Sequence, residues 1–484
     1  MLRKDLLGLR PSAVAVQGGC RPLVPLPRKC RRLVAMHPSF VAVLLVALAA
    51  CARPHPPAET ASRPSSAQSS PAQPPSDAPL ETRTGPPLLA VPSSFALELV
   101  ESWPLETSLD HKDLRDAKEV WPELFGNAKE RIDLAQFYAS NAPGSALEKC
   151  VQAIEAAAAR GVKVRFLAEE KFYKTYPETL DRLARARGVE VRRFFVRRVM
   201  GGVLHAKYFV IDSREAYLGS QNFDYRSLEH IQELGVRLRV PAAVRALQDL
   251  FEMDWAFAGG VEQSARVAPP EGGYGFPSPI ASADVPAAEA RASMQTRGAV
   301  TLVASPKGFL PDEKLWDLPA LVRLIDSSKR SVRVQLLTYR SRTRGETFPD
   351  LEDALLRAAA RGARVELLLS NWSLRKGTIE PLQKLHAPPG LTIKILSVPE
   401  WSGGFIPFAR VAHAKYLVVD GERAWVGTSN WERDYFFQSR NVGVLIDGGP
   451  LPARLDAFFR DGWEGPYAAA LDPQRTYEPP RVAK

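Results

Sequence analysis

The stretch that decides the fold is HAKYFVIDSREAYLGSQN at residues 205–222, which returns as HAKYLVVDGERAWVGTSN at residues 413–430. Each copy contains a His, a Lys two positions later, an Asp five positions after the Lys, and a Gly-Ser or Gly-Thr turn that leads to an Asn. Two copies with the same internal spacing indicate a duplicated unit rather than a chance match. The sequence therefore predicts an enzyme whose active site is shared between two homologous halves.

The flanking segments repeat as well. RGVKVRFLAE at 160–169 matches RGARVELLLS at 361–370, and RIDLAQFY at 131–138 matches SVRVQLLTY at 331–339. Short β-type runs alternate with amphipathic helical segments in both halves, which is typical of an α/β fold. We expect two duplicated α/β/α lobes with mixed β-sheets, related by a pseudo-twofold axis, with the active site at their interface.

Composition divides the chain into six segments. The predicted boundaries are a leader at 1–50, a Pro/Ser/Ala-rich linker at 51–94, a first lobe at 95–257, a connection at 258–298, a second lobe at 299–470 and a tail at 471–484. The net charge is +10, but the leader alone carries +7 and the remainder only about +3. Net charge therefore does not distinguish a nucleic-acid substrate from a lipid.

The leader has the features of a signal peptide. A basic run precedes the apolar segment 41–50, which is too short to span a bilayer and ends in small residues before Cys51. LAAC at 48–51 resembles a bacterial lipoprotein box and predicts lipidation of Cys51. A lipid anchor would place the protein in the bacterial cell envelope, on the outer membrane in a Gram-negative organism.

Two other interpretations of the leader remain, an uncleaved anchor and an ordinary secretory signal. Met36 is an alternative start, which would leave the basic run untranslated. After cleavage, Cys150 would be the only Cys besides Cys51, so no internal disulfide framework is expected. We expect Cys150 to be a buried apolar residue on a helix.

The repeated motif suits phosphate chemistry. In an extended strand, residues two apart share a face, so Lys207 lies beside His205 and Lys415 beside His413. Two Lys and two Asn could hold the nonbridging oxygens of a phosphodiester and stabilise the charge of its transition state. One imidazole could attack phosphorus and form a phosphohistidine, while the other protonates the leaving oxygen.

A catalytic metal is not expected. The seven His include no HExxH pattern, and no Cys pair or acidic cluster stands beside either motif. A Lys next to each motif His would also repel a cation. The sequence thus predicts no metal site and no cofactor.

The motif HxKx4Dx6GS/TxN resembles the HKD motif of the phospholipase D superfamily, over nearly all of residues 95–465. NWS at 371–373 and GTSNW at 427–431 are similar to the subgroup of phospholipase D family members three and four, here with a bacterial lipoprotein signal in place of their membrane anchor. The resemblance implies phosphodiesterase activity in a phospholipase D-like fold. It implies that one motif His is the nucleophile and the other the general acid.

The same resemblance assigns the remaining motif residues. Those implied to bind phosphate are Lys207, Lys415, Asn222 and Asn430. Those implied to be structural members of the motif are Asp212, Asp420, Gly219, Ser220, Gly427 and Thr428.

An acidic residue distinguishes the two copies. Glu233 stands eleven residues after Asn222, where relatives carry an acid that bonds the motif His, whereas Asn441 stands eleven residues after Asn430. A carboxylate behind an imidazole orients the ring and favours its charged form. We therefore predict that Glu233 orients His205, that His205 is the nucleophile, and that His413 is the general acid.

The predicted activity is metal-independent hydrolysis of phosphodiester bonds, in phospholipids or in single-stranded nucleic acid. The alternatives are a single-strand exonuclease rather than a lipase, a cardiolipin synthase-like phosphatidyltransferase, and an inactive surface binding protein. We expect a monomer with internal duplication, held at a membrane by its lipid. Two further segments have two interpretations each: 191–200 (VRRFFVRRVM) is either a phosphate-binding stretch or an edge strand, and the aromatics at 431 and 435–437 either line the site or fill the core.

Overall fold

The computed structural model describes residues 97–261, 269–271, 273–275, 298–343, 346–386 and 388–483. These residues belong to one compact unit that starts at Thr84. The leader, Cys51, the linker and most of the predicted connection lie outside the described residues, so the interpretations of those segments stay predictions. Within the described ranges, no helix is both long enough and apolar enough to cross a bilayer.

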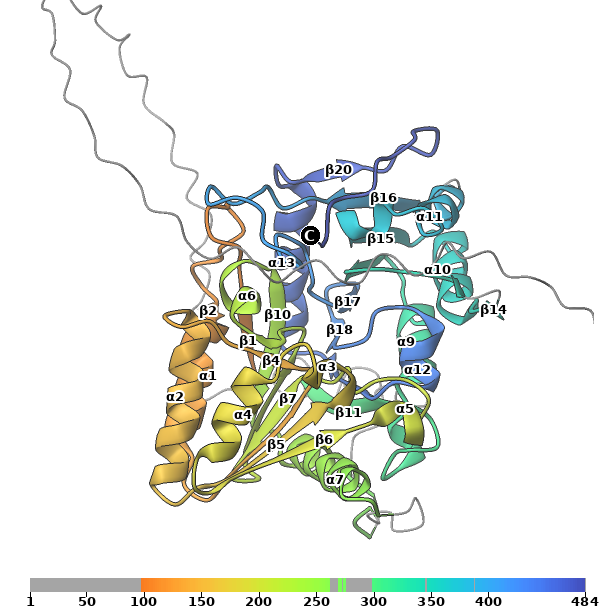
Figure 1. The fold of residues 1–484 in the computed structure, drawn as a ribbon. Coiled ribbons are helices and arrows are strands. Elements are labelled where there is room, and N and C mark those ends of the chain that lie inside the picture. Colours follow the sequence, from red (N-terminus) through yellow and green to blue (C-terminus); the bar gives the residue numbers. More distant parts are fainter. Residues whose placement is uncertain are drawn as a thin grey trace, which may run out of the picture. The chain divides into compact units, whose positions relative to one another are not determined.

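The first lobe is built on an eight-stranded sheet with the order β2-β1-β10-β8-β7-β3-β5-β6 (Figure 1). Its strands are β1 Leu97–Ser102, β2 Arg115–Asp116, β3 Arg131–Gln136, β5 Lys163–Glu169, β6 Val189–Phe194, β7 Tyr208–Ile211, β8 Glu215–Gly219 and β10 Glu233–Leu238. Its longer helices are α1 Ala117–Asn127, α2 Ala146–Ala159, α4 Glu178–Arg185 and α7 Pro241–Ala258. Shorter elements are β4 Ala139–Ser140, β9 Phe223–Asp224, α3 Glu170–Tyr173, α5 Val196–Val199 and α6 Tyr225–Glu229.

The second lobe repeats this plan in the order β11-β19-β18-β17-β12-β15-β16-β20. Its strands are β11 Ala299–Ser305, β12 Ser331–Leu336, β15 Arg364–Ser370, β16 Leu391–Leu396, β17 Tyr416–Val419, β18 Arg423–Gly427, β19 Asn441–Asp447 and β20 Ala468–Ala470. Its helices are α9 Asp317–Asp326, α10 Asp350–Ala360, α11 Ile379–Leu385, α12 Arg433–Phe437 and α13 Leu451–Glu464. Shorter elements are η1 Glu313–Leu315, η2 Asn371–Leu374, β13 Arg342–Thr343 and β14 Glu346–Thr347.

The two sheets share one strand order except at one edge strand each, β2 beside β1 in the first sheet and β20 beside β16 in the second. In each, three parallel strands (β3, β5, β6 and β12, β15, β16) continue into an antiparallel hairpin (β7–β8 and β17–β18) that carries the repeated motif. Both sheets are mixed and covered by helices, so the predicted duplicated α/β fold is confirmed. Cys150 is buried on α2, as expected.

Two local features, segment 191–200 and Pro122, are placed by the structure as follows. Segment 191–200 forms the end of edge strand β6 and the short helix α5, which matches the edge-strand interpretation. Pro122 lies inside α1, with Trp121 and Leu124 beside it in the core. It lies beyond the first turn of α1, so its missing N–H costs one intrahelical hydrogen bond.

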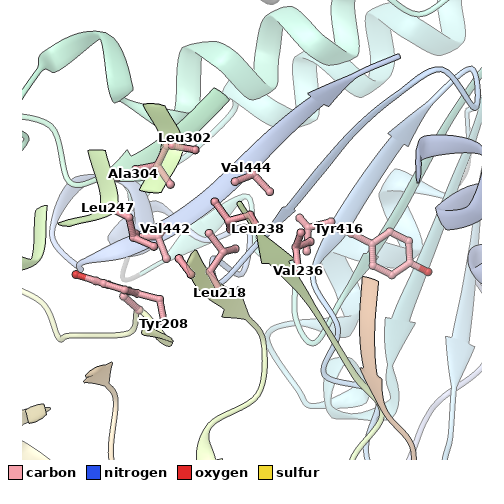
Figure 2. Close-up of a cluster of buried hydrophobic side chains, with 14 of the residues drawn as sticks. Tyr208, Leu218, Val236, Leu238, Leu247, Leu302, Ala304, Tyr416, Val442 and Val444 are labelled. Atoms are coloured by element: carbon pink, nitrogen blue, oxygen red, sulfur yellow. The ribbon is translucent and has the colours of Figure 1, made fainter. Parts of the chain in front are cut away.

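One hydrophobic core runs through both lobes. Figure 2 shows side chains from β7, β8 and β10 packed against others from β11, β17 and β19, with Leu247 of α7 among them. Helix α7 packs on the first sheet and also contacts β11 of the second lobe, while α13 packs on the second sheet and contacts β1 of the first. The lobes therefore share a continuous apolar interface.

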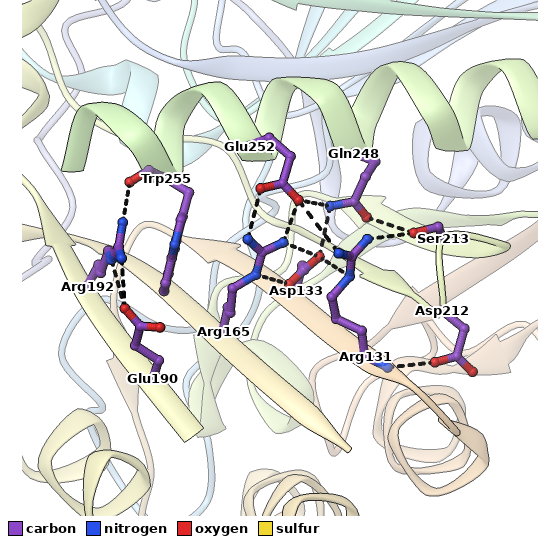
Figure 3. A network of polar contacts seen from close by, with 10 residues as sticks. All are labelled: Arg131, Asp133, Arg165, Glu190, Arg192, Asp212, Ser213, Gln248, Glu252 and Trp255. Carbon is purple, nitrogen blue, oxygen red and sulfur yellow. Dashed lines mark hydrogen bonds and ion pairs between the residues drawn. The ribbon is translucent and has the colours of Figure 1, made fainter. Parts of the chain in front are cut away.

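A polar network fixes α7 on the first sheet (Figure 3). The Arg165 guanidinium donates to Asp133 at 2.6 and 2.8 Å and to Glu252 of α7 at 2.6 and 2.8 Å. Gln248 of α7 also donates to Asp133, at 2.8 Å. Paired, bidentate contacts of this kind define geometry more sharply than apolar packing alone. Helix α7 is thereby held in a fixed position at the boundary between the lobes.

His111 connects the lobes at another point. Its Nδ1 lies 2.8 Å from Glu101 of β1, its Nε2 lies 3.4 Å from Asp461 of α13, and its ring packs on Phe458 at a centroid distance of 4.6 Å. Burial alone would lower the pKa of His111, but the hydrogen bonds to the two carboxylates outweigh it and raise the pKa from 6.5 to about 9. Between pH 6.5 and about 9, His111 therefore stays protonated in the folded protein but loses its proton in the unfolded chain.

This proton makes stability fall as pH rises. Between pH 6.5 and about 9 the free energy of unfolding should drop, by at most about 3 kcal/mol because Asp461 is largely exposed. Urea unfolding at pH 6.5 and pH 9 measures the drop. We expect His111→Gln to lose most of this dependence; an equal drop in the variant would assign it to other groups.

Candidate active site

The two motif His come together at the lobe boundary. The backbone before His205 pairs with the start of β19, with an N–H···O bond of 2.9 Å from His205 to Arg440. In the same way, the backbone before His413 pairs with the residue before β10, with a bond of 2.8 Å from His413 to Gln232. Each motif is thus held by the strand that follows the other motif.

This exchange corrects the predicted partner of Glu233. Its Oε1 lies 2.7 Å from Nδ1 of His413, in the other lobe, and not beside His205. The prediction that Glu233 orients His205 is therefore wrong. The reason is topological: Gln232 pairs with the segment before His413, which aligns the next residue, Glu233, with that imidazole.

His205 has a neutral partner instead. Oδ1 of Asn441 lies 3.1 Å from Nδ1 of His205, and the Asn441 amide group donates to the carbonyls of Tyr435 at 2.9 Å and Ser439 at 3.3 Å. These two carbonyls fix which end of the amide is oxygen, so Nδ1 of His205 must be the donor. Nε2 of His205 is then the free nitrogen.

Asn441 is held in place by a buried ion pair. The preceding residue, Arg440, donates to both oxygens of Asp254 on α7 at 2.7 Å, and both side chains are 0% exposed. The same guanidinium donates to the carbonyls of Ser305 and Phe309 at 2.8 Å. Loss of one partner in a pair this deeply buried typically costs about 3–5 kcal/mol. A second polar contact of α7, the Asp254–Arg440 pair, therefore fixes the backbone next to Asn441, the partner of His205.

The motif side chains form one strongly electropositive, nearly closed site. His205 and His413 are 5% and 8% exposed, and Lys207 and Lys415 are fully buried. Nζ of Lys415 donates to the His413 carbonyl at 2.5 Å, and Nζ of Lys207 donates to the His205 carbonyl. Each motif His and Lys is therefore a compact pair, in agreement with the strand alternation of the sequence.

Burial and mutual repulsion govern protonation in this site. Burial, followed by the nearby ammonium groups, lowers the pKa of both His205 and His413 well below 6.5. Burial lowers the pKa of Lys415 to about 7, and burial together with Lys415 lowers the pKa of Lys207. Burial raises the pKa of Glu233 to about 8, against the opposing charges of the two Lys. A bound anion would offset this excess of positive charge.

The turns after the motif strands bring Asn222 and Asn430 to the same site. Gly219 faces Gly235 across the β8–β10 pair, where an added Cβ would lie 2.6 Å from the Gly235 Cα, so only Gly fits. Gly427 and Gly443 face each other in the same register in the second lobe, where an added Cβ on either would lie 2.4 Å from the Trp425 indole. Ser220 and Thr428 accept hydrogen bonds from the N–H groups of the facing strands, at 3.0 and 3.1 Å.

The two Asn amides differ in their contacts. Nδ2 of Asn430 donates to the Tyr435 hydroxyl at 3.2 Å, and its Oδ1 lies 3.5 Å from the Thr338 N–H. Oδ1 of Asn222 is buried and finds no hydrogen-bond partner among the described residues. This oxygen is an acceptor, so only a ligand that donates an N–H or O–H can satisfy it, whereas the Nδ2 group of Asn222 is the donor that an anion could use.

Asp212 and Asp420 lie at the far ends of the motif strands. Each has a positive φ, 51° and 57°, and each carboxylate accepts three backbone N–H groups at 2.7–2.9 Å. These donors precede β3 and β12, the neighbouring strands. Each carboxylate therefore links the end of a motif strand to the start of the neighbouring strand, and these contacts place neither carboxylate against a motif imidazole.

A family model described as the PLD-like domain of cardiolipin synthase matches the chain twice, at residues 122–255 and 321–463. The chain belongs to the phospholipase D superfamily. Phospholipase D Z of Dictyostelium discoideum is 29% identical over 391 residues, which cover 77% of this chain and 90% of that protein. The 5'-3' exonuclease PLD3 of Bos taurus is 31% identical over 384 residues, which cover 73% and 76%.

The crystal structure of phosphatidylserine synthase from Haemophilus influenzae Rd KW20 matches 73% of this chain and 85% of its own, with a TM-score of 0.51 and 12% identity. That likeness supports the superfamily fold.

Two aromatic rings flank His205. The ring centroids of Phe137 and Tyr435 lie 5.0 and 4.8 Å from the imidazole, both edge-on. Tyr435 belongs to the aromatic run noted in the sequence, whose other members divide: Trp431 and Phe436 are in the core, and Phe437 packs against it. Phe137 was not predicted. Its signal was its place just after β3, since residues at the carboxyl ends of parallel strands commonly line sites.

The Arg residues of β6 are occupied within the fold. Arg192 pairs with Glu190 at 2.9 Å and packs on the Trp255 ring at 4.3 Å. Arg193 pairs with Glu170 at 3.2 Å and packs on the Tyr173 ring at 4.4 Å. These contacts favour the structural interpretation of this stretch over a phosphate-binding one.

One group of acids in the described ranges is close enough to share a metal ion, namely Glu101, Asp110 and Asp116. None of them belongs to the repeated motif, and Glu101 already accepts from His111. Within the part of the chain that the structure describes, the carboxylate that touches a motif imidazole is that of Glu233, and two Lys ammonium groups adjoin it. This donor set suits an anion rather than a cation.

Proposed function

We propose that the protein is a metal-independent phosphodiesterase in which His413, backed by Glu233, forms the phosphohistidine and His205 is the general acid. This reverses the roles predicted from sequence. The observation that carries the proposal is the 2.7 Å contact between Glu233 and Nδ1 of His413, against the neutral Asn441 at His205. A carboxylate at Nδ1 directs the Nε2 lone pair outward and stabilises the positive charge that the ring gains on attack.

In the first step, Nε2 of His413 attacks phosphorus and the bond to the leaving oxygen breaks. Nε2–H of cationic His205 gives its proton to that oxygen. Burial and then the Lys charges lower the pKa of His205, and the bound phosphodiester anion favours the charged form because it offsets those Lys charges. Lys207, Lys415 and the two motif Asn hold the nonbridging oxygens.

In the second step, neutral His205 takes a proton from water, the water oxygen bonds to phosphorus, and the phosphorus–nitrogen bond to His413 breaks. The products are an alcohol and a phosphomonoester, and both imidazoles return to their starting states. An alcohol in place of water would give transfer, as in a phosphatidyltransferase. The substrate class is a phospholipid or single-stranded nucleic acid, as the names of the two relatives suggest.

Activity in a chelator tests this proposal. The full-length protein should hydrolyse bis-p-nitrophenyl phosphate equally well with and without EDTA, and His413→Ala should be inactive. Assays with phosphatidylcholine and a 5'-hydroxyl single-stranded oligonucleotide, each with and without added ethanol, identify the substrate and the acceptor. Loss of all activity in EDTA, or full activity of His413→Ala, would contradict the mechanism.

A further inference from the structure

A second cationic surface lies next to the site, on the second lobe. Arg340 follows β12, and its backbone N–H donates to the carbonyl of Trp431 at 2.9 Å. Trp431 directly follows Asn430, whose amide belongs to the catalytic motif. Two residues before Arg340, the N–H of Thr338 approaches Oδ1 of Asn430. The Arg340 backbone is therefore fixed at the edge of the site, where it pairs with the residue that follows Asn430, a predicted phosphate ligand.

Arg375 extends this surface from the end of η2. Its guanidinium carbon lies 5.2 Å from the centroid of the Trp372 ring. The Ser370 and Ser373 hydroxyls donate to the Leu337 carbonyl at 2.8 and 3.2 Å. These bonds fix the turn that carries Trp372 and Arg375.

The Trp372 side chain packs against a small apolar cluster of Ile231, Leu337 and Val411. Ile231 stands two residues before Glu233, and Val411 stands two residues before His413. The Trp372–Arg375 turn thus rests on the segments that carry the proposed nucleophile and its carboxylate.

The charge on this surface is not fully compensated. Nε of Arg340 donates to Thr378 Oγ1 at 3.1 Å, and its Nη1 lies 3.8 Å from Glu432, which also accepts from the Thr338 hydroxyl. No carboxylate among the described residues pairs with Arg375. Burial, followed by repulsion from Arg340, lowers the pKa of Arg375, although a guanidinium still stays charged. Arg340 therefore has one carboxylate, that of Glu432 at 3.8 Å, and Arg375 has none among the described residues.

An exposed aromatic ring completes the surface. Phe408 is 45% exposed, and its ring lies 6.5 Å from that of Trp372 at an angle of 73°. The Phe408 N–H donates to the Val482 carbonyl at 2.9 Å, so its backbone is tied to the C-terminal segment. Cationic groups interleaved with accessible aromatics are the usual means of holding a single nucleic-acid strand.

We propose that Arg340 and Arg375 bind a second phosphate of the substrate, one that is not cleaved, while Trp372 and Phe408 contact an adjoining base. The subsite rests on the proposed phosphodiesterase function and assigns it a substrate class, a chain of successive phosphodiesters such as a single-stranded oligonucleotide. A phosphatidylcholine carries one phosphate and would leave the subsite unused.

Two substrates that differ in phosphate number test the subsite. The ratio of kcat/KM for a ten-residue oligothymidylate to that for the dinucleotide TpT should fall about tenfold in Arg375→Gln and in Arg340→Gln. Arg375→Lys keeps the charge and should recover part of the ratio. The matched control is Arg364→Gln, at the opposite end of β15 from the turn. An unchanged ratio in both Gln variants, or an equal fall in the control, would overturn the subsite.

Binding gives a readout that does not depend on turnover. The slope of log Kd against log salt for the oligothymidylate should become shallower by about 0.7 in each Gln variant, since one phosphate contact is lost. If the wild type binds the oligonucleotide with the same slope as the variants, the subsite is wrong. If the wild type shows these slopes but cleaves no phosphodiester, the proposed function fails while the subsite stands. Turnover of phosphatidylcholine without oligonucleotide binding would overturn the subsite and leave the phosphodiesterase intact.

Discussion

Glu233→Gln is expected to lower kcat/KM for bis-p-nitrophenyl phosphate by about 10³- to 10⁴-fold without unfolding the protein. The Gln side chain can present its amide group to Nδ1 of His413, which moves the imidazole proton to Nε2 and removes the attacking lone pair. It also removes the negative charge that stabilises the imidazolium of the phosphohistidine. Steady-state kinetics, with the midpoint of thermal unfolding as a check on folding, measure the effect.

The equivalent position in the other lobe supplies the control. Asn441→Asp places a carboxylate 3.1 Å from Nδ1 of His205, where the wild type has an amide oxygen. This change favours cationic His205, which the general acid already requires, so we expect a change in kcat/KM of less than about tenfold. A small effect of Glu233→Gln together with a large effect of Asn441→Asp would assign attack to His205.

The two His variants should differ in their dependence on the leaving group. A nucleoside alkoxide must be protonated as it leaves, so His205→Ala should lower oligonucleotide hydrolysis by about 10⁴-fold. p-Nitrophenolate leaves without a proton, so the same variant should still complete the first step with bis-p-nitrophenyl phosphate. It should release about one p-nitrophenol per site in a burst and then stall, because no base activates water.

His413→Ala removes the nucleophile and should fail with both substrates, showing no burst at all. Rapid-mixing absorbance measurements distinguish the two patterns. A burst in His413→Ala with none in His205→Ala would show that the roles are those first predicted from sequence.

Much of the fold follows from local patterns. The repeated segments at 131–138 and 160–169 contain β3 and β5, and the helix expected to carry Cys150 is α2. Alternating and helical periodicities determine such elements, because burial of one face selects both the element and its register. The duplication was equally visible, since two copies of a spaced motif need two copies of the sheet that presents them.

The partner of Glu233 could not be obtained in this way. Glu233 lies on β10 of the first sheet, one strand away from β8 and two from the motif strand β7, so sequence proximity suggests His205. Its actual contact depends on where that strand begins relative to the other lobe, which Gln232 fixes by pairing with the segment before His413. The same pairing between Arg440 and Leu204 assigns Asn441 to His205. No pattern within one half encodes an exchange between halves.

The most direct test of the central claim, that His413 carries the phosphoryl group, is to find the labelled residue. His205→Ala is mixed with bis-p-nitrophenyl ³²P-phosphate, quenched in alkali during the burst, digested and mapped by mass spectrometry. We predict one phosphohistidine per chain, in the peptide that contains His413 and not in any first-lobe peptide. Label in the His205 peptide of the wild-type enzyme, or a burst without any phosphohistidine, would contradict the account.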